Sequence, residues 1–210
     1  MNADPATTLQ AGIQALGLSL EGDTQEKLLA YLALLHKWNV VYNLTAIRDP
    51  GAMVSHHLLD SLAVLPHLWP GRWLDVGCGG GTPGLVLAMA RPEWSFTLLD
   101  SNSKKTGFVQ QAVIELGLKN VKVHPGRVEQ WQSPEKFEGI ISRAFAELAD
   151  FLRLTRHLLA PGGRWAAMKG RVSEELVVVP GEFEISKVIQ LTVPGVAAER
   201  NLVLVKVAGE

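Results

Sequence analysis

The chain has 210 residues, of which 47% are hydrophobic and 20% are charged, a composition that excludes an intrinsically disordered protein. The formal net charge of −1 argues against a protein that grips nucleic acid with its whole surface. No apolar run approaches the roughly 18 residues that would span a bilayer, and the single cysteine, Cys78, excludes an intrachain disulfide.

The start of the chain, MNADPATT, has neither the basic residues nor the apolar stretch of a signal peptide. We therefore expect a cytoplasmic protein that contacts no membrane. The charges are unevenly distributed, because the segment 100–171 has more basic than acidic residues and the rest of the chain has the reverse. This pattern fits one local patch for an anionic partner, and it equally fits ordinary scatter.

The first 70 residues have the pattern of helices. Leucines recur at helical spacing within Gln25–Asn39, and a second apolar stripe predicts a helix over Ala52–Leu68. A Pro-Gly pair at 70–71 then marks a change to short apolar runs. We therefore expect a helical extension over residues 1–70 that packs on a core over residues 71–210, the two forming one compact unit.

Strand-like and helix-like segments alternate in the core. The expected strands are Arg72–Val76, Ser95–Leu99, Val121–His124, Gly139–Ser142, Trp165–Lys169, Ile185–Leu191 and Leu202–Val207. The expected helices are Pro83–Ala90, Lys104–Leu116 and Glu147–Leu159, with a shorter one at Val128–Gln132. This alternation predicts an α/β fold with a mostly parallel seven-stranded sheet, and the short link between the last two strands predicts a terminal antiparallel hairpin. Ligands of such sheets bind at the C-terminal ends of the strands.

A glycine-rich loop, G-C-G-G-G-T-P-G at residues 77–84, follows the first of these strands. A dinucleotide-binding G-x-G-x-x-G would need a glycine where Thr82 stands, and this departure weakens the case for an NAD site. The loop with its preceding acid instead matches D-x-G-x-G-x-G, typical of methyltransferases that use S-adenosylmethionine. A carboxylate there can approach the α-ammonium of that cofactor, directly or through water. The cofactor-binding residues predicted from this motif are Asp75, Gly77, Gly79 and Gly81.

Polar residues also follow the next strands. Asp100 ends the second strand, where a carboxylate can accept both ribose hydroxyls of a nucleotide. After the third strand, a backbone amide and the Glu129 carboxylate are placed to hold an adenine. Arg143 follows the fourth strand and is expected at the mouth of the pocket.

Metal chemistry and cysteine chemistry find no support in the sequence. The six histidines show neither H-E-x-x-H nor a Cys/His ligand spacing, so we expect no metal. Cys78 lies inside the glycine loop, where we interpret it as a small residue that permits close packing.

Several motifs together resemble the RsmG family, also called glucose-inhibited division protein B, and the resemblance covers nearly the whole chain. These motifs are Lys37-Trp38-Asn39, Tyr42 to Pro50, His57-Leu58-Leu59-Asp60-Ser61, Asp75 to Gly84, Leu98 to Ser101, Arg127-Val128-Glu129, Ile141 to Phe145 and Lys169-Gly170. The resemblance implies a class I (Rossmann-like) fold and transfer of a methyl group from S-adenosylmethionine, leaving S-adenosylhomocysteine, to N7 of a guanine in 16S ribosomal RNA. The family's cofactor contacts carry over onto Gly77, Thr82, Val128, Glu129 and Arg143.

Guanine N7 has an exposed lone pair, so its methylation needs positioning and exclusion of water rather than a general base. Arg143 is the first candidate for positioning the base and Lys169 the second. The candidates for contacts with RNA are Arg48, His57, Lys104, Lys105, Arg127 and Arg171. A near-neutral enzyme is expected to bind naked RNA weakly, so we expect it to act on 16S ribosomal RNA within a small-subunit particle. We also expect the enzyme to be a monomer.

Alternatives remain open at this point. The polar residues Asn39, Asn43, Arg48, His57, Asp60 and Ser61 either line the substrate side of the cleft or join the helices to the sheet. A methyltransferase for a small molecule, an NAD-dependent oxidoreductase and a non-catalytic sensor or RNA-binding module are the competing functions. A closed apolar cap over the pocket would favour the small molecule, and an open basic cleft would favour RNA.

Overall fold

The computed structural model describes residues 4–171 and 179–210. Within them, one mixed seven-stranded sheet has the order β3-β2-β1-β4-β5-β7-β6. The strands are β1 (Arg72–Val76), β2 (Ser95–Asp100), β3 (Val121–Pro125), β4 (Phe137–Arg143), β5 (Leu159–Lys169), β6 (Phe183–Leu191) and β7 (Arg200–Val207). The first five strands pair in parallel, and β7 runs antiparallel to both β5 and β6. The predicted α/β sheet and its terminal hairpin are confirmed.

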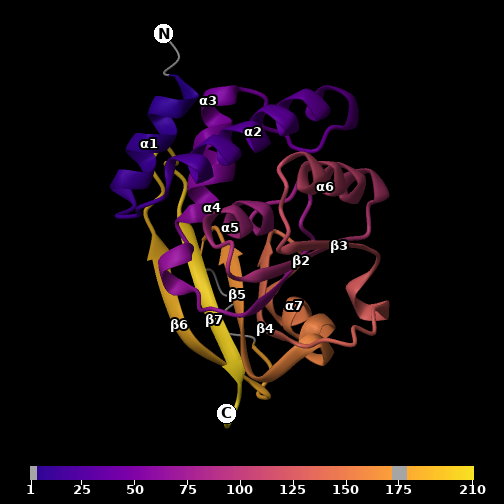
Figure 1. Cartoon of the computed structure of the whole chain (residues 1–210). Helices are drawn as coiled ribbons and strands as arrows, with labels where there is room; N and C mark the ends of the chain where they lie inside the picture. The colour runs from indigo at the N-terminus through magenta and orange to yellow at the C-terminus, as the bar shows by residue number, and fades with distance from the viewer. Residues whose placement is uncertain (1–3, 172–178) are drawn as a thin grey trace.

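Helices cover both faces of the sheet (Figure 1). The helices of the core are α5 (Gly84–Ala90), α6 (Ser103–Glu115) and α7 (Leu148–Thr155). One apolar cluster joins α5, α6 and the N-terminal helices to the sheet. A second cluster joins α7 to the opposite face. The sheet is therefore buried on both sides, which explains the nearly continuous apolar character of its central strands.

Short one-turn segments complete the core. The 3-10 helices Val128–Gln130 and Arg156–Leu158 follow β3 and α7. The helix predicted over Glu147–Leu159 is too long, since Leu159 already belongs to β5, where it pairs with Phe137.

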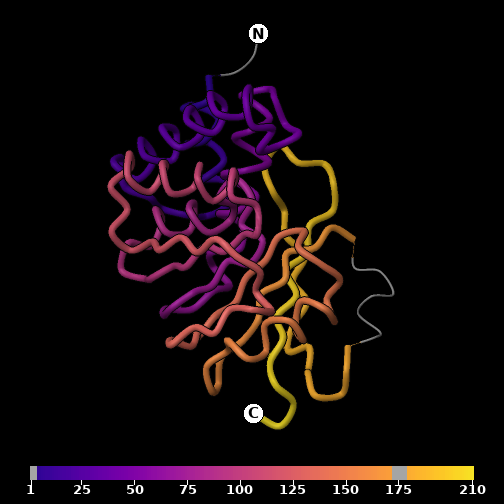
Figure 2. The backbone as a smooth tube through the Cα atoms, turned by 90° about the vertical axis from the view of Figure 1, so that its right-hand side faces the viewer, coloured from indigo at the N-terminus to yellow at the C-terminus, as the bar shows by residue number. Residues whose placement is uncertain are grey.

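The N-terminal helices are α1 (Pro5–Ala15), α2 (Gly22–Tyr42), α3 (Pro50–Met53) and α4 (Asp60–Leu62). Asp4 caps α1, since its side chain accepts a hydrogen bond from the amide of Thr7, and Pro5 suits the first turn. Helix α2 packs over α5 and α6. Figure 2 shows that the turn between β6 and β7 reaches the N-terminal helices. Gly195 of that turn lies against Ser55.

The single helix predicted over Ala52–Leu68 is wrong. The segment consists of α3, a π-helix over Val54–Leu59, α4 and a 3-10 turn over Leu65–His67. Two physical causes are visible. Pro66 lacks an amide hydrogen and cannot continue an α-helix, and the carbonyl of His56 in the π-helix accepts a hydrogen bond from Arg143. π-Helical turns are rare and concentrate at functional sites.

Candidate functional site

The glycine loop turns sharply between β1 and α5. Its first amides, those of Gly77 and Cys78, donate to the carbonyl of Leu99 at 2.8 and 3.1 Å. Gly77 has a φ of 71°, and a Cβ there would lie 2.7 Å from the ring of Phe145. The backbone therefore passes so close to Phe145 that a side chain would not fit, which together with the positive φ explains the glycine at this position.

Asp100 fixes the loop to the end of β2. Its Oδ2 accepts from the amide of Gly79 at 2.9 Å, and its Oδ1 accepts from the amide of Asn102 at 2.8 Å. Each carboxylate oxygen can accept a further hydrogen bond. Asp100 also lines a cavity, so it can support the loop and still bind the hydroxyls of a ribose.

Three neighbouring cavities follow the C-terminal ends of the strands. The first, of about 440 Å³, is lined by Asp100, Val128 and Glu129 among others. The second, of about 260 Å³, is lined by Gly79, Thr82 and Arg143 among others. Both share the wall formed by Gly77, Lys105 and Ala144. We name them the β2–β3 cavity and the loop cavity.

The third cavity has a volume of about 330 Å³ and is bounded by β5, β7 and the π-helix. Lys169, Arg200 and Asn201 line it, and it shares His57, Arg143 and Ala144 with the loop cavity. We name it the β5–β7 cavity. Arg143 therefore stands on the wall between the two cavities.

Arg143 is held in place by several acceptors. One terminal nitrogen donates to the carbonyl of His56 at 2.8 Å and to Asp60 Oδ2 at 3.1 Å, and the other contacts the Thr82 hydroxyl. The second oxygen of Asp60 accepts from Arg200 Nε at 3.0 Å. Asp60 is only 2% exposed, so one buried carboxylate fixes two guanidinium groups at the rim of the β5–β7 cavity.

His57 lies beside this cluster and is buried. Its Nε2 is 3.0 Å from the Thr45 hydroxyl, and its Nδ1 has no partner among the described residues. Burial first, and then the positive charge of Arg143, lower the pKa of His57 from 6.5 to about 4. A buried neutral imidazole is not a phosphate-binding cation. It is instead a polar group at the wall of two cavities, able to donate or accept one hydrogen bond.

Asp75 and Gly81 line none of these cavities. Asp75 is fully buried under the loop, and its Oδ2 accepts from the amide of Gly84 at 2.8 Å. Its other oxygen has no partner in the described part of the chain. Burial raises the pKa of Asp75 to about 7. The structure thus places this carboxylate at the start of α5, so its predicted contact with the cofactor stays a prediction.

The other candidates divide between the cavity walls and the surface. Lys169 donates to the carbonyl of Ala146 at 2.7 Å. Lys105 is half-buried, and Arg127 is exposed with an ion pair to Glu129 at 3.8 Å. Arg48, Lys104 and Arg171 are exposed.

The polar N-terminal residues all form internal contacts. Asn39 accepts from the amide of Thr45 at 2.8 Å, and Ser61 donates to the carbonyl of His57 at 2.6 Å. Asp60 holds Arg143 and Arg200. Of these residues, only Asp60 joins the helices to the sheet, through Arg143 of β4 and Arg200 of β7, and it also lines the β5–β7 cavity. The bonds of Asn39 and Ser61 stay within the N-terminal segment. Asn43 and Arg48 are exposed and contact each other at 3.5 Å.

Sequence reasoning missed Arg200 and Asn201. A signal was available, because an antiparallel last strand starts at the edge where the parallel strands end. The residues just before the predicted strand Leu202–Val207 could therefore have been predicted as site residues. Tyr31 was missed as well: its hydroxyl donates to the carbonyl of Gly80 at 2.7 Å from the middle of α2, where the sequence shows only an apolar stripe.

Comparison with known proteins decides the family. The family model described as GidB, rRNA small subunit methyltransferase G, matches residues 24–203, well over half of the chain. The chain belongs to this family. Ribosomal RNA small subunit methyltransferase G of Laribacter hongkongensis is 55% identical over 93% of this chain and 95% of the relative. The protein of the same description from Nitrosospira multiformis is 51% identical over 99% of this chain and all of the relative.

Solved structures support the fold of this family member. TrmN from Thermus thermophilus aligns with a TM-score of 0.57 at 20% identity, covering 73% of this chain and 53% of that one. A SAM-dependent methyltransferase from Aquifex aeolicus aligns with a TM-score of 0.58 at 19% identity, covering 75% and 93%. At such low identity these matches show the fold alone. The chain has the class I methyltransferase fold and is an S-adenosylmethionine-dependent rRNA methyltransferase.

The residues that line these cavities fit S-adenosylmethionine. The β2–β3 cavity offers the Asp100 and Glu129 carboxylates, which suit the hydroxyls of a ribose and the amino group of an adenine. The loop cavity continues along the glycine backbone for the remainder of the molecule. Cavities of a few hundred Å³ hold ligands of this size. Residues 4–171 and 179–210 contain no group of three or more His, Cys, Asp or Glu that would hold a metal ion. None of their helices is both long and apolar enough to cross a membrane.

Proposed function

We propose that this enzyme transfers the methyl group of S-adenosylmethionine to N7 of a guanine in 16S ribosomal RNA. The observation that carries the proposal, beside the family, is the shared wall at Arg143. The loop cavity and the β5–β7 cavity meet there, so a methyl donor in one can face a base in the other. We assign the donor to the β2–β3 and loop cavities and the guanine to the β5–β7 cavity.

The contacts proposed for the donor follow from this arrangement. Asp100 accepts the ribose hydroxyls, Glu129 and the backbone at Val128 hold the adenine, and the loop backbone and Thr82 border the rest. Gly79 offers its backbone to the donor in the loop cavity, and Asp75 and Gly81 support the loop and keep their predicted role in binding the donor. S-adenosylmethionine would supply an electrophilic methyl group at this place.

The contacts proposed for the base require no proton transfer. Arg143 donates to the guanine O6, which leaves the N7 lone pair free to form the new C–N bond as the C–S bond breaks. The sulfur keeps the bonding pair and becomes a neutral thioether, while the positive charge moves to the guanine ring. Lys169 is the second positioning residue. Catalysis then consists of alignment in a site that excludes water.

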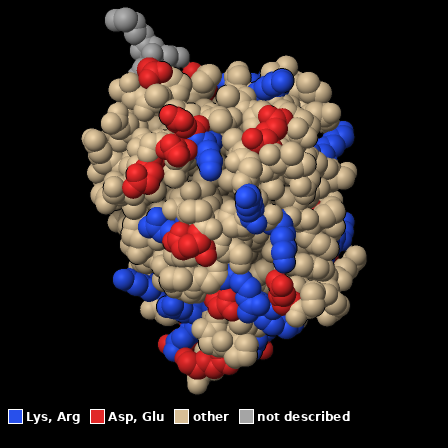
Figure 3. All heavy atoms as spheres, viewed as in Figure 1, with Lys and Arg blue, Asp and Glu red and all other residues tan. Residues whose placement is uncertain are grey.

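The substrate and the state of the enzyme are part of the proposal. We propose a cytoplasmic monomer in which residues 1–70 and 71–210 act as one unit on a small-subunit particle, without a metal. On the face shown in Figure 3, basic and acidic side chains are interspersed and no continuous basic surface is present, so we expect contacts with RNA to be local. The predicted RNA contacts are the exposed Arg48, Lys104, Arg127 and Arg171, the half-buried Lys105, and His57, which is buried at the wall of two cavities.

The proposal is tested with labelled S-adenosylmethionine and three acceptors: small subunits from cells that lack the enzyme, their purified 16S RNA, and a small-molecule extract. We expect label in the RNA of the subunits, lowered at least about 10-fold in Arg143→Ala, the scale of one lost arginine–guanine contact. Arg91→Ala is the matched control, because Arg91 follows α5 at the opposite edge of the sheet. Label confined to the small-molecule extract would refute the RNA substrate.

A further inference from the structure

The C-terminal end of α2 exposes three consecutive side chains with large apolar parts. Val40, Val41 and Tyr42 are 78%, 68% and 43% exposed. Scattered exposed apolar residues are ordinary, but three such residues together in the last turn of an otherwise well-packed helix indicate a contact surface. We name the surface formed by these three residues the α2 platform.

The α2 platform is rigidly supported. The ring of Tyr42 stacks on that of Trp38 at a centroid distance of 5.3 Å, and Trp38 packs on Phe108 of α6 at 5.6 Å. Asn43 ends the helix in the left-handed conformation, with a φ of 50°. An aromatic ring held this way is already in place for a partner, so little side-chain freedom is lost on binding.

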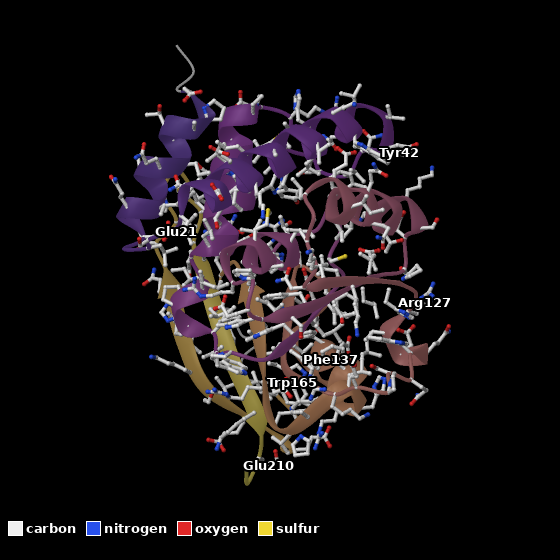
Figure 4. The ribbon with its side chains drawn as sticks, viewed as in Figure 1. Glu21, Tyr42, Arg127, Phe137, Trp165 and Glu210 are labelled. Atoms are coloured by element: carbon white, nitrogen blue, oxygen red, sulfur yellow. The ribbon has the colours of Figure 1, made fainter. Side chains whose placement is uncertain are left out.

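The platform adjoins the mouth of the cofactor cleft. The chain leaves Tyr42 and two residues later lines the loop cavity with Leu44 and Thr45, in the company of Lys105 from α6. Lys104 precedes Lys105 and is exposed. Figure 4 shows Tyr42 and Arg127 at the same edge of the molecule, on the side of α6.

Basic residues flank the α2 platform on both sides in the sequence. Lys37 and Arg48 are exposed, one before and one after it, and Arg48 contacts Asn43 beside Tyr42. An exposed aromatic ring with aliphatic neighbours and nearby basic residues is typical of proteins that bind unpaired nucleic acid. In these proteins the bases stack on the rings and the phosphates bind the basic side chains. An acidic or neutral border would have favoured a protein partner.

We propose that the α2 platform binds an unpaired nucleotide of the RNA segment that carries the methylated guanine, and that the base of this nucleotide stacks on the ring of Tyr42. The inference rests on the proposed function. A guanine that enters the β5–β7 cavity leaves its own stack, so the RNA segment around it is unpaired and its bases can stack on protein rings. The cations of the rim take the phosphates of the same nucleotides.

The test compares Tyr42→Ala, Tyr42→Leu and Tyr42→Phe in methyl transfer to small subunits and in binding to purified 16S RNA. We expect Tyr42→Ala and Tyr42→Leu to raise both KM and the Kd for RNA at least about 5-fold, the lower bound for losing one stacked base. Tyr42→Phe keeps the ring and is expected to match the wild type. The Kd for S-adenosylhomocysteine should stay the same in all three, which separates stacking from damage to the cleft.

Ile114→Ala is the matched control, because Ile114 is 64% exposed on α6 and borders none of the three cavities. Wild-type KM and Kd in Tyr42→Ala would overturn the platform while leaving the proposed function intact. Weaker binding to the subunit with unchanged binding to RNA would also overturn it and assign the platform to a ribosomal protein. A wild-type enzyme that neither binds nor methylates either RNA form would overturn both proposals.

Discussion

Asp60 joins two cationic side chains that come from distant parts of the chain. Its oxygens lie 3.1 Å from Arg143 and 3.0 Å from Arg200, while the carboxylate itself is almost fully buried. Burying a carboxylate beside a single cation costs desolvation free energy, but two charge-assisted hydrogen bonds offset this cost. This residue thereby connects the N-terminal helices, β4 and β7 at the proposed guanine site.

Asp60→Asn should therefore affect both stability and activity. It leaves two guanidinium groups side by side without their anion, which should lower the free energy of unfolding by about 3 kcal/mol and reduce methyl transfer. Glu138→Gln is the control, because Glu138 pairs with Arg72 at the surface and should cost less than about 1 kcal/mol. Urea unfolding of both variants measures the difference, and equal small losses would contradict a structural role for Asp60.

His57 makes stability depend on pH. Its folded pKa of about 4 lies below the value of 6.5 for an exposed histidine, so protons bind the unfolded chain more readily. The contribution is present above pH 6.5 and disappears as the pH falls toward 4, a loss of at most about 3 kcal/mol. His57→Gln should flatten this part of the profile, as followed by urea unfolding between pH 4.5 and 7.5. An unchanged difference between the two pH values in the variant would exclude His57 as the cause.

At the scale of elements, α2 supports the cofactor loop through one hydrogen bond. The hydroxyl of Tyr31 donates to the Gly80 carbonyl, and burial raises the pKa of that hydroxyl, so it stays protonated. Tyr31→Phe should lower the free energy of unfolding by about 1 kcal/mol and weaken S-adenosylmethionine binding several-fold, as measured by calorimetry. Tyr42→Phe, at an exposed ring, is the control. Equal cofactor affinity in both variants would show that the loop keeps its shape without α2.

Two helical glycines, Gly84 of α5 and Gly107 of α6, should respond oppositely to alanine. A Cβ on Gly84 would meet Asp75 Oδ2 at 2.7 Å and the Leu98 side chain at 2.8 Å, whereas a Cβ on Gly107 meets nothing within 4 Å. Gly107→Ala should stabilise the protein by up to about 1 kcal/mol through helix propensity, and Gly84→Ala should destabilise it. Thermal unfolding ranks the two, and a stabilised Gly84→Ala would contradict the close packing of α5 against β1 and β2.

Regular elements could be predicted because each leaves a pattern in its own residues. The strand Arg72–Val76 and the terminal hairpin are examples, since alternating strand and helix segments and a short link reveal them. The end of the helix predicted over Ala52–Leu68 could have been read from Pro66, which stands in the 3-10 turn. The π-helix could not be predicted from periodicity, because the Arg143 side chain that binds the His56 carbonyl is 87 residues away in the sequence. The pairing of Asp60 with Arg200 is hidden for the same reason: it depends on β7 returning to the edge where the parallel strands end.

At the scale of the molecule, the site lies where the strand order changes between β1 and β4, beneath the N-terminal helices. The glycine loop, Asp100 and Arg143 were all predicted from their places after strands, and the structure brings them to adjoining cavities. The other predicted site residues differ in how deeply their side chains are buried. Asp75 looks like a site residue in the sequence, but its side chain is enclosed under the loop and borders none of the three cavities, whereas the buried His57 borders two of them. No local sequence pattern distinguishes these two situations.

The central claim is that a guanine is methylated at N7, and one measurement tests it most directly. Small subunits from cells that lack the enzyme are methylated in vitro, and their 16S RNA is cleaved chemically at N7-methylguanine to locate the modification. The account predicts cleavage at one guanine, and no methyl transfer once that guanine is replaced by 7-deazaguanine. Transfer that persists on the 7-deaza substrate, or label on another atom, would contradict it.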